Sequence, residues 1–172
     1  PAAGFGPSER LNLGYVGRWR EASLGLSYSY ERESTDSFYQ ADLGIRGIDE
    51  TPESALAQGA LAMFAAIADV STVAKKTQFV QRCSAPDVPT LFVEWLNELL
   101  YQREVHDVLF ACARVTRLVE DERGWHLEGV AQGETIDLDR HQVHTEIKAA
   151  TYAGLAYRRE GDSYLVQCIV DV

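Results

Sequence analysis

The sequence predicts an α+β fold, a single domain with two main helices and mostly antiparallel strands. Two segments carry apolar residues at helical spacing, and most of the remaining segments alternate apolar and polar residues as strands do. Short polar turns join neighbouring strand segments into hairpins, which favours antiparallel pairing. At 172 residues the chain is long enough to bury one core.

The first well-patterned element is an expected strand over residues 38–48. Leu43 and Ile45 share one face of this strand, and Asp42 and Arg46 lie on the opposite face. Its two glycines indicate a bulge or a close approach of another backbone.

Residues 1 to about 33 differ in character from the rest of the chain because they are rich in Gly, Ser, Arg and Tyr. Residues 24–30 alternate as a strand does, but glycines interrupt the pattern. We therefore expect residues 1–37 to form a partly ordered extension that can contribute one edge strand, and residues 38–172 to form the domain.

Both helices are predicted from N-terminal signals followed by apolar stripes. Thr51 can cap the first helix, with Pro52 at its first position and Glu53 complementing the helix dipole. Asp87 can cap the second helix, whose wide apolar face indicates burial between layers. The apolar positions are Leu56, Ala60, Met63, Phe64 and Ile67 in the first helix, and Leu91, Phe92, Trp95, Leu96, Leu99 and Leu100 in the second.

The remaining strands are expected after the first helix and in two hairpins. Their ranges are 74–83, then 108–118 with 125–131, and finally 147–157 with 164–172. Residues 132–134 are expected to turn the chain. Glu134 could act as a general acid or base there, but a carboxylate in a turn is usually solvated.

Composition limits the classes of function. The sequence has 16 basic and 26 acidic residues, a net charge of −10, which disfavours a main role in gripping nucleic acid. No apolar run is long enough to cross a bilayer, and the first residues lack the pattern of a leader peptide. The three cysteines are widely spaced and suggest buried, reduced thiols in a reducing compartment.

The most informative feature is the pair of carboxylates at the end of the last expected strand. Asp171 stands beside Val172, whose free α-carboxylate would lie one residue away, and Asp42 is a candidate to join them. Two carboxylates about 4 Å apart repel by about 4 kcal/mol at an effective dielectric near 20. Such groups must be protonated, splayed apart or bound to a cation. The alternative is that Asp171 only solubilises a frayed chain end.

Other candidate sites carry weaker signals. His141 and His144 lie three residues apart, but in an extended segment they would face opposite sides, which disfavours a zinc site. The sequence contains neither a glycine-rich phosphate loop nor a nucleophile elbow. Lys148 has small neighbours and could present a point charge to a partner's phosphate or carboxylate.

Five motifs in order resemble the archease family over about residues 38–172. The segments are Gln40-Ala41-Asp42-Leu43-Gly44-Ile45-Arg46-Gly47, the helix Leu91 to Tyr101, Gly133-Glu134 with Asp137, Arg140 and His141, Ile147-Lys148-Ala149-Ala150-Thr151-Tyr152, and Val170-Asp171-Val172. The resemblance implies a β/α/β layered sandwich. It also implies a small cytoplasmic accessory protein, not an enzyme and not bound to a membrane.

The resemblance further implies a partner, a metal and a set of site residues. Archeases assist a GTP-dependent RNA ligase that joins 3′-phosphate or 2′,3′-cyclic-phosphate ends to 5′-hydroxyl ends, as in tRNA splicing and RNA repair. They promote guanylylation and turnover of that ligase and meet RNA only indirectly. By resemblance Asp42, Asp171 and Val172 hold a divalent cation. We expect Lys148 and Glu134 to lie near that site and, together with Thr151, to contact the ligase.

Oxygen ligands of this kind suit Ca²⁺, Mg²⁺ or Mn²⁺ rather than zinc. The family often has a histidine shortly before the first aspartate, where this chain has Tyr39, and another after the Thr-Tyr pair, where this chain has Ala153. Two further hypotheses remain open at this stage: a metal-dependent hydrolase that uses the same carboxylates, and an interaction module that binds no metal.

Overall fold

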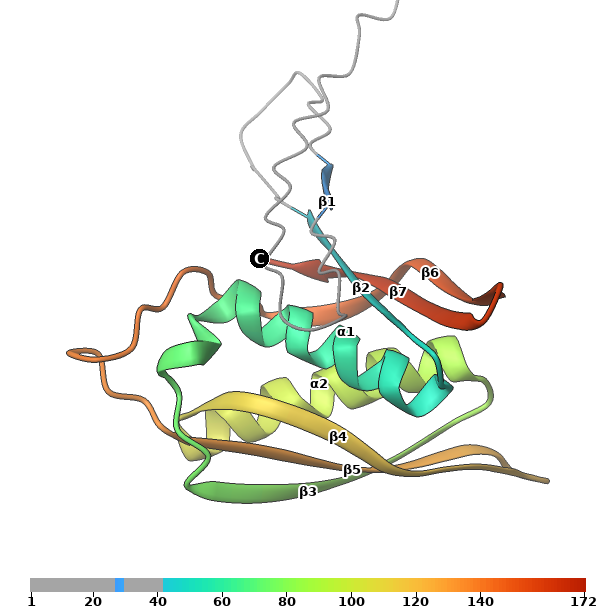
Figure 1. Ribbon diagram of the computed structural model, residues 1–172, viewed down its shortest axis with the longest axis horizontal. Coiled ribbons are helices and arrows are strands. Elements are labelled where there is room, and N and C mark those ends of the chain that lie inside the picture. The colour runs from blue at the N-terminus through green and yellow to red at the C-terminus, as the bar shows by residue number, and fades with distance from the viewer. Residues whose placement is uncertain (1–26, 30–41) are drawn as a thin grey trace, which may run out of the picture.

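The computed structural model describes residues 27–29 and 42–172, with residues 27–29 and Asp42 described through their backbone alone. In this part of the chain two main helices lie between two antiparallel sheets (Figure 1). The predicted α+β fold is therefore confirmed, and its layering is the β/α/β sandwich that the resemblance implied. The start of the strand expected over residues 38–48 and most of the expected extension lie outside the described residues.

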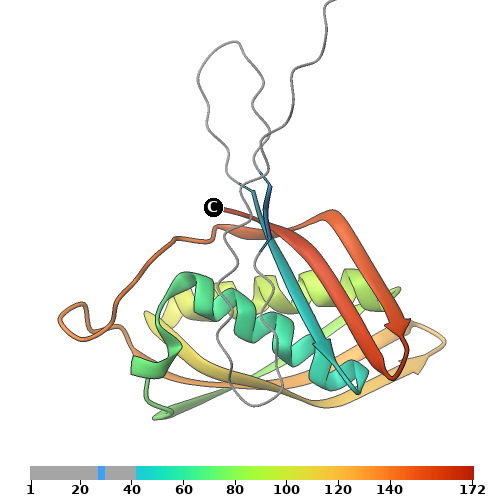
Figure 2. The same cartoon turned by 45° about the horizontal axis from the view of Figure 1, so that its top comes forward.

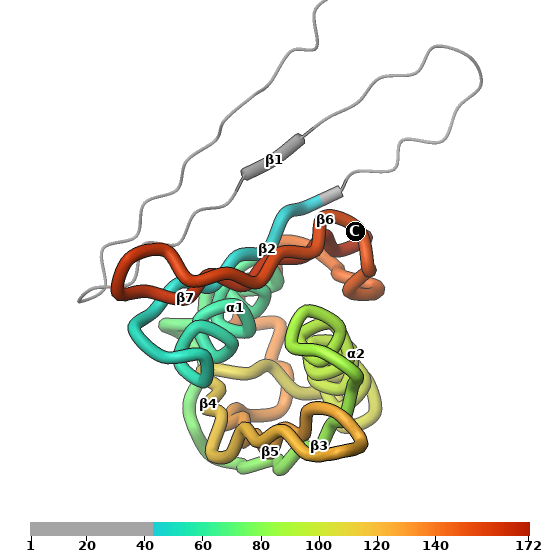
Figure 3. Tube along the Cα trace, turned by 90° about the vertical axis from the view of Figure 1, so that its right-hand side faces the viewer, coloured from blue at the N-terminus to red at the C-terminus, as the bar shows by residue number. Residues whose placement is uncertain are grey.

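The two sheets differ in size and in chain order. The four-stranded sheet runs in the order β1 (Ser27–Ser29), β2 (Asp42–Asp49), β7 (Ser163–Asp171) and β6 (Ala149–Glu160). The three-stranded sheet runs in the order β3 (Thr77–Ala85), β5 (Gly124–Thr135) and β4 (Val108–Asp121). Figure 2 shows β2, β7 and β6 side by side, and Figure 3 shows the helical layer enclosed by the sheets.

The helices begin where the sequence predicted. In α1 (Pro52–Ile67) the hydroxyl of Thr51 accepts a hydrogen bond from the Ser54 N–H at 3.1 Å. In α2 (Val88–His106) the carboxylate of Asp87 accepts from the Thr90 N–H at 2.8 Å. A short 3₁₀ helix, η1 (Val70–Thr72), follows α1. Both caps satisfy amide groups that would otherwise lack a partner at a helix start.

The core lies around the helices, and the apolar stripes predicted from the sequence face it. Residues of both helices that are fully buried include Leu56, Ala60, Met63, Leu91, Phe92, Trp95, Leu96 and Leu99. The sheets contribute Ile45, Val166, Cys168 and Val170 from one side, and Phe110, Leu127 and Ala131 from the other. Burial on two sides explains why the stripe of α2 is so wide.

One expected turn is a strand. Residues 132–134 continue β5 to Thr135, with Gly133 opposite Thr77 of β3 and Phe110 of β4. The glycine marks a close approach of two backbones, because a Cβ at Gly133 would lie 1.9 Å from the carbonyl oxygen of Leu109. A glycine in a strand often has this cause, so the turn was the wrong interpretation of the residue.

A second close approach holds α1 against the four-stranded sheet. A Cβ added to Gly47 of β2 would lie 2.0 Å from the carbonyl oxygen of Ala55 and 2.4 Å from the backbone nitrogen of Gly59. Gly59 in turn packs under the ring of Phe92. The close approach predicted from the glycines of this strand is therefore confirmed at Gly47, where α1 lies directly on β2.

We predict that Gly47→Ala destabilises the protein by about 1–3 kcal/mol, because the new methyl group meets backbone atoms that cannot rotate away. Urea denaturation followed by circular dichroism measures the change. An unfolding free energy within experimental error of the unsubstituted protein would contradict the described contact between α1 and β2.

Asn97 of α2 takes the place of a neighbouring strand at the free edge of β6. Its side-chain amide donates to the Ala150 carbonyl oxygen at 3.0 Å, and its side-chain oxygen accepts from the Ala150 N–H at 2.8 Å. Both groups of Ala150 point away from β7 and would otherwise lack a backbone partner. The pair therefore fixes the first residues of β6 on the helical layer.

We predict that Asn97→Ala lowers the unfolding free energy by about 1–2 kcal/mol, because two half-buried backbone groups lose their partners. Chemical denaturation checks this, with the exposed Glu104→Ala on the same helix as a control for the gain in helix propensity. Equal stability of the two variants would show that the amide pair contributes nothing.

Candidate functional site

The end of the four-stranded sheet brings two of the predicted metal-binding positions together. In the antiparallel register Asp42 is opposite Asp171, and Ala149 of β6 is opposite Asp171 on the other side. The next pair, Leu43 with Val170, includes a fully buried residue on the side of the helices. Because faces alternate along a strand, positions 42 and 171 lie on the face directed away from the helices.

Lys148 lies beside the same chain end. Its backbone N–H donates to the Asp171 carbonyl oxygen at 2.9 Å, and its ammonium donates to the main-chain oxygen of Val172 at 3.2 Å. Thr151, also predicted to contact a partner, donates its hydroxyl to the Ile169 carbonyl oxygen at 2.9 Å. The structure thus gathers Asp42, Asp171 and Thr151 at neighbouring strand positions, with Lys148 directly before β6 and Val172 directly after β7.

The metal prediction rests on this register. Among the residues with described side chains, no group of three or more His, Cys, Asp or Glu side chains could hold a metal ion. The side chain of Asp42 lies outside the described part, and the α-carboxylate of Val172 is not among those residue types. Carboxylates are hard oxygen ligands, and residues of this type at positions 42 and 171 fit a divalent cation such as Ca²⁺, Mg²⁺ or Mn²⁺.

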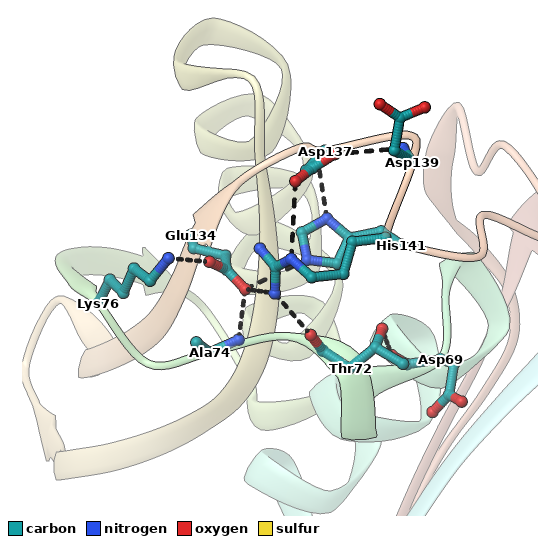
Figure 4. A network of polar contacts seen from close by, with 9 residues as sticks. Asp69, Thr72, Ala74, Lys76, Glu134, Asp137, Asp139 and His141 are labelled. Carbon is teal, nitrogen blue, oxygen red and sulfur yellow. Dashed lines mark hydrogen bonds and ion pairs between the residues drawn. The ribbon is translucent and has the colours of Figure 1, made fainter.

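Glu134 lies in a different part of the structure from the predicted metal-binding positions, and the expectation that its side chain is solvated was wrong. It lies near the end of β5, in the other sheet, and only 3% of its side chain is exposed. Its carboxylate accepts from the Ala74 N–H at 2.6 Å and from Arg140 at 2.7 Å, and it pairs with Lys76 at 2.8 Å. Figure 4 shows Lys76 and the Ala74 N–H directed at the carboxylate of Glu134.

The network around Glu134 fixes the charge state of its carboxylate. Hydrogen bonds from Arg140, Lys76 and the Ala74 N–H hold the pKa of Glu134 well below its usual range, although burial acts in the opposite direction. A buried carboxylate that stays ionised and is fully bonded cannot take up a proton readily at neutral pH. This argues for a positioning role and against the general acid or base considered from the sequence.

His141 is buried within the same network. Its Nδ1 accepts from the Asp137 N–H at 3.0 Å, so the ring proton lies on Nε2, which is 3.1 Å from the carboxylate of Glu134. His144 is exposed, and its backbone N–H donates to the Ile67 carbonyl oxygen at 2.8 Å. The two histidines therefore share no site, and the weak zinc signal is explained by a structural histidine.

A surface pocket of about 640 Å³ adjoins the network. Its lining includes Lys76 and Thr77 from the start of β3 and the segment 134–140. The lining mixes acidic and basic side chains, which disfavours a site for a simple anion. The pocket thus lies beside Glu134, Asp137 and Arg140, which the sequence singled out.

Two of the three thiols, those of Cys83 and Cys168, are poor nucleophiles. Cys83, Cys112 and Cys168 are all free, and only Cys168 is fully buried, so the expectation of three buried thiols was too strong. Burial raises the pKa of Cys168 to about 12, and burial with nearby Glu98 and Glu94 raises that of Cys83 to about 12. Such groups are protonated at neutral pH and unreactive.

Comparison with known proteins identifies the family. The model of the archease protein family (MTH1598/TM1083) matches residues 34–172. The chain belongs to the archease family. The protein archease of Methanopyrus kandleri is 34% identical over 134 residues, which cover 78% of this chain and 95% of that protein. The protein archease of Methanosarcina mazei is 33% identical over 150 residues, 87% of this chain and 99% of that protein.

Solved archease structures show the same fold. The solution structure of Methanobacterium thermoautotrophicum protein 1598 superimposes with a TM-score of 0.65 at 27% identity, covering 87% of this chain and 99% of that one. The crystal structure of a Thermotoga maritima archease, described as a possible chaperone, gives a TM-score of 0.50 at 14% identity over 83% of this chain and 100% of that one. At that identity the second likeness supports the fold alone.

None of the helices in the described part of this archease combines the length and the apolar character needed to span a bilayer. Tyr39, where the family often has histidine, lies outside the described residues. Ala153, at the other such position, is exposed on β6 and its N–H lies 3.3 Å from the Thr151 hydroxyl oxygen.

Sequence reasoning missed the partners of Glu134. Ala74 and Lys76 precede β3 and are far from Glu134 in sequence, and their approach depends on the pairing of β3 with β5. One local signal was available, because Arg140 and His141 follow Glu134 at short spacing and their donors match a carboxylate. That signal could have suggested a buried cluster, although not its position.

We predict that Glu134→Gln lowers the melting temperature at neutral pH, and that its difference from the unsubstituted archease shrinks in acid. The folded-state pKa of Glu134 lies below its ordinary value of 4.5, so its ionised form stabilises the fold above that pH. This contribution is lost as the pH falls from about 4.5 toward the folded-state pKa. Thermal unfolding from pH 7 to pH 3 checks it, and a constant difference would contradict the network.

Proposed function

We propose that this archease is a non-catalytic accessory protein of a GTP-dependent RNA ligase. The ligase joins 3′-phosphate or 2′,3′-cyclic-phosphate ends to 5′-hydroxyl ends, and the archease promotes its guanylylation and repeated turnover in tRNA splicing or RNA repair. The protein acts in the cytoplasm and meets RNA only through the ligase. A divalent cation held by Asp42, Asp171 and the α-carboxylate of Val172 supports this action.

The observation that carries the proposal is the register that sets Asp42 opposite Asp171. Like charges directly opposite on one face of a sheet destabilise it. A doubly charged cation between them would attract both carboxylates. This explains the pairing of two like charges better than a solubilising role of Asp171 does. Asp171 and Val172 are both partly exposed, so a partner can reach this group.

The surrounding residues fit a cation that is handed to, or shared with, a partner. The ammonium of Lys148 already bonds the Val172 oxygen at 3.2 Å, so a cation would share that oxygen or release Lys148 toward a partner's phosphate. When bound, the cation would supply positive charge for the phosphates of a nucleotide. The residues of this chain would hold that charge and orient Lys148 beside it.

Charge also supports a protein partner that binds nucleic acid. The net charge of −10 complements the basic surface that an RNA ligase needs for its own substrate. Membership of the archease family supports an accessory role. The protonated thiols of Cys83 and Cys168 and the fully bonded Glu134 favour this role over that of a hydrolase.

We predict that this protein, added to its purified ligase with GTP, raises the number of ligations per ligase molecule, because the cation and Lys148 assist guanylylation. Asp171→Asn and Asp42→Ala should abolish the gain, whereas Asp162→Asn should keep it. Asp162 is an exposed carboxylate in the turn at the other end of the same hairpin and serves as the matched control. No gain with the unsubstituted protein, or an equal gain with Asp42→Ala, would end the proposal.

Calorimetry with Ca²⁺ and with Mn²⁺ tests the metal independently of the ligase. Binding should be present in the unsubstituted protein and in Asp162→Asn, and absent in Asp171→Asn. Binding that is unchanged in Asp171→Asn would remove the proposed ligands. Phosphodiesterase activity of this chain alone with Mn²⁺ would instead favour a metal-dependent hydrolase.

A further inference from the structure

Leu138 is the most exposed large hydrophobic side chain in the described part of the chain, with 79% of its surface in solvent. A single exposed leucine on a mobile loop is ordinary and needs no explanation. Leu138 differs because it stands at the tip of a turn, residues 137–140, whose backbone and supporting side chains are fixed. The turn was part of a motif noted in the sequence, but nothing in the metal-centred proposal uses it.

Four hydrogen bonds fix the backbone of this turn. The N–H groups of Arg140 and His141 donate to the Asp137 carbonyl oxygen at 3.1 and 2.7 Å. The Asp139 N–H donates to the Asp137 carboxylate at 3.1 Å, and the Asp137 N–H donates to Nδ1 of His141 at 3.0 Å. Leu138 is therefore held between residues that are all bonded.

The turn is also anchored to the sheet below it. Arg140 donates to the buried carboxylate of Glu134 at 2.7 Å and to the Thr72 carbonyl oxygen at 3.1 Å. The imidazole of His141 completes the anchor on Glu134 from a fully enclosed position. A side chain presented on such a support loses little conformational freedom when it binds, which is how preorganised anchors gain affinity.

Acidic groups flank Leu138 on both sides. The carboxylate of Asp137 is half exposed, and Asp139 is exposed. Figure 4 shows the carboxylate of Asp139 directed away from the Glu134 network. The pocket of about 640 Å³ opens beside the turn and is lined in part by Leu138. An apolar tip between two carboxylates matches an apolar pocket bordered by Lys or Arg.

We propose that Leu138 is a docking anchor that inserts into an apolar, basic-rimmed pocket on the protein partner of this archease. The inference rests on the proposed function, which supplies a partner whose surface is basic because it binds RNA. The connection of residues 136–148 carries Leu138 near its start and Lys148 at its end. One partner that covers this connection thus contacts Leu138 together with the carboxylate cluster, which consists of Asp42, Asp171 and the α-carboxylate of Val172.

The anchor and the carboxylate cluster have separable roles. Leu138 sets the affinity for the partner, whereas Asp171 and the cation set what the bound protein does. Loss of Leu138 is therefore overcome by a higher concentration of the protein, and loss of Asp171 is not. This difference provides the readout that a merely structural role of Leu138 would not produce.

We predict that Leu138→Ala weakens binding to the purified ligase about tenfold and that Leu138→Asp weakens it further, because hot-spot anchors lose this much on truncation. Surface plasmon resonance measures the dissociation constant. Tyr101→Ala removes another exposed apolar side chain, on α2, and should bind as the unsubstituted protein does. Since Leu138 is largely in solvent, both variants should keep their melting temperature and their affinity for Mn²⁺.

The decisive outcomes distinguish the two proposals. At saturating concentration Leu138→Ala should restore full turnover of the ligase, whereas Asp171→Asn should bind with unchanged affinity and fail to stimulate. Affinity of Leu138→Ala equal to that of the unsubstituted protein would overturn the anchor and leave the accessory function standing. Failure of the unsubstituted protein to bind the ligase would overturn both.

Discussion

The pairing of β2 with β7 is the constraint on which the rest of the structure depends. It sets Asp42 opposite Asp171, and it places Ile45 opposite Cys168 on the buried face. A slip of one residue would turn the buried set to solvent and the carboxylates toward the helices, so burial fixes the register strongly. The geometry of the carboxylate cluster is thus enforced by the hydrophobic core and not by the charged groups themselves.

The two helices connect the β2–β7 pair to β6 at the edge of the four-stranded sheet. Gly47 and Gly59 let α1 lie directly on β2, with Phe92 of α2 closing the contact from the other side. Asn97 of the same helix then holds β6 through both backbone groups of Ala150. Because Lys148 directly precedes β6, these contacts fix the charge that stands beside Asp171. Packing in the interior and the position of the ammonium are therefore linked.

At Glu134 the relation is reversed, because there a buried charge holds a segment of the backbone in place. A carboxylate that is removed from water needs several hydrogen-bond donors to remain ionised. Here the donors are Ala74 and Lys76, which precede β3, and Arg140 in the turn after β5. These hydrogen bonds offset the free-energy cost of burying the carboxylate. The one from Arg140 also anchors the turn that presents Leu138. The sequence showed a glycine followed by an acid and suggested a solvated turn, because burial by a distant segment leaves no local mark.

The sequence by itself determined the class of fold, the helix starts at Thr51 and Asp87, the apolar stripes and the family. These properties follow from local periodicity, capping chemistry and motif order, which neighbouring residues carry without reference to the rest of the chain. Only the tertiary structure decided that Glu134 is buried apart from the carboxylate cluster, that His141 supports it and that Asn97 closes an edge. Each of these depends on contacts between segments far apart in sequence, and burial and hydrogen-bond partners of that kind are set by how whole layers pack.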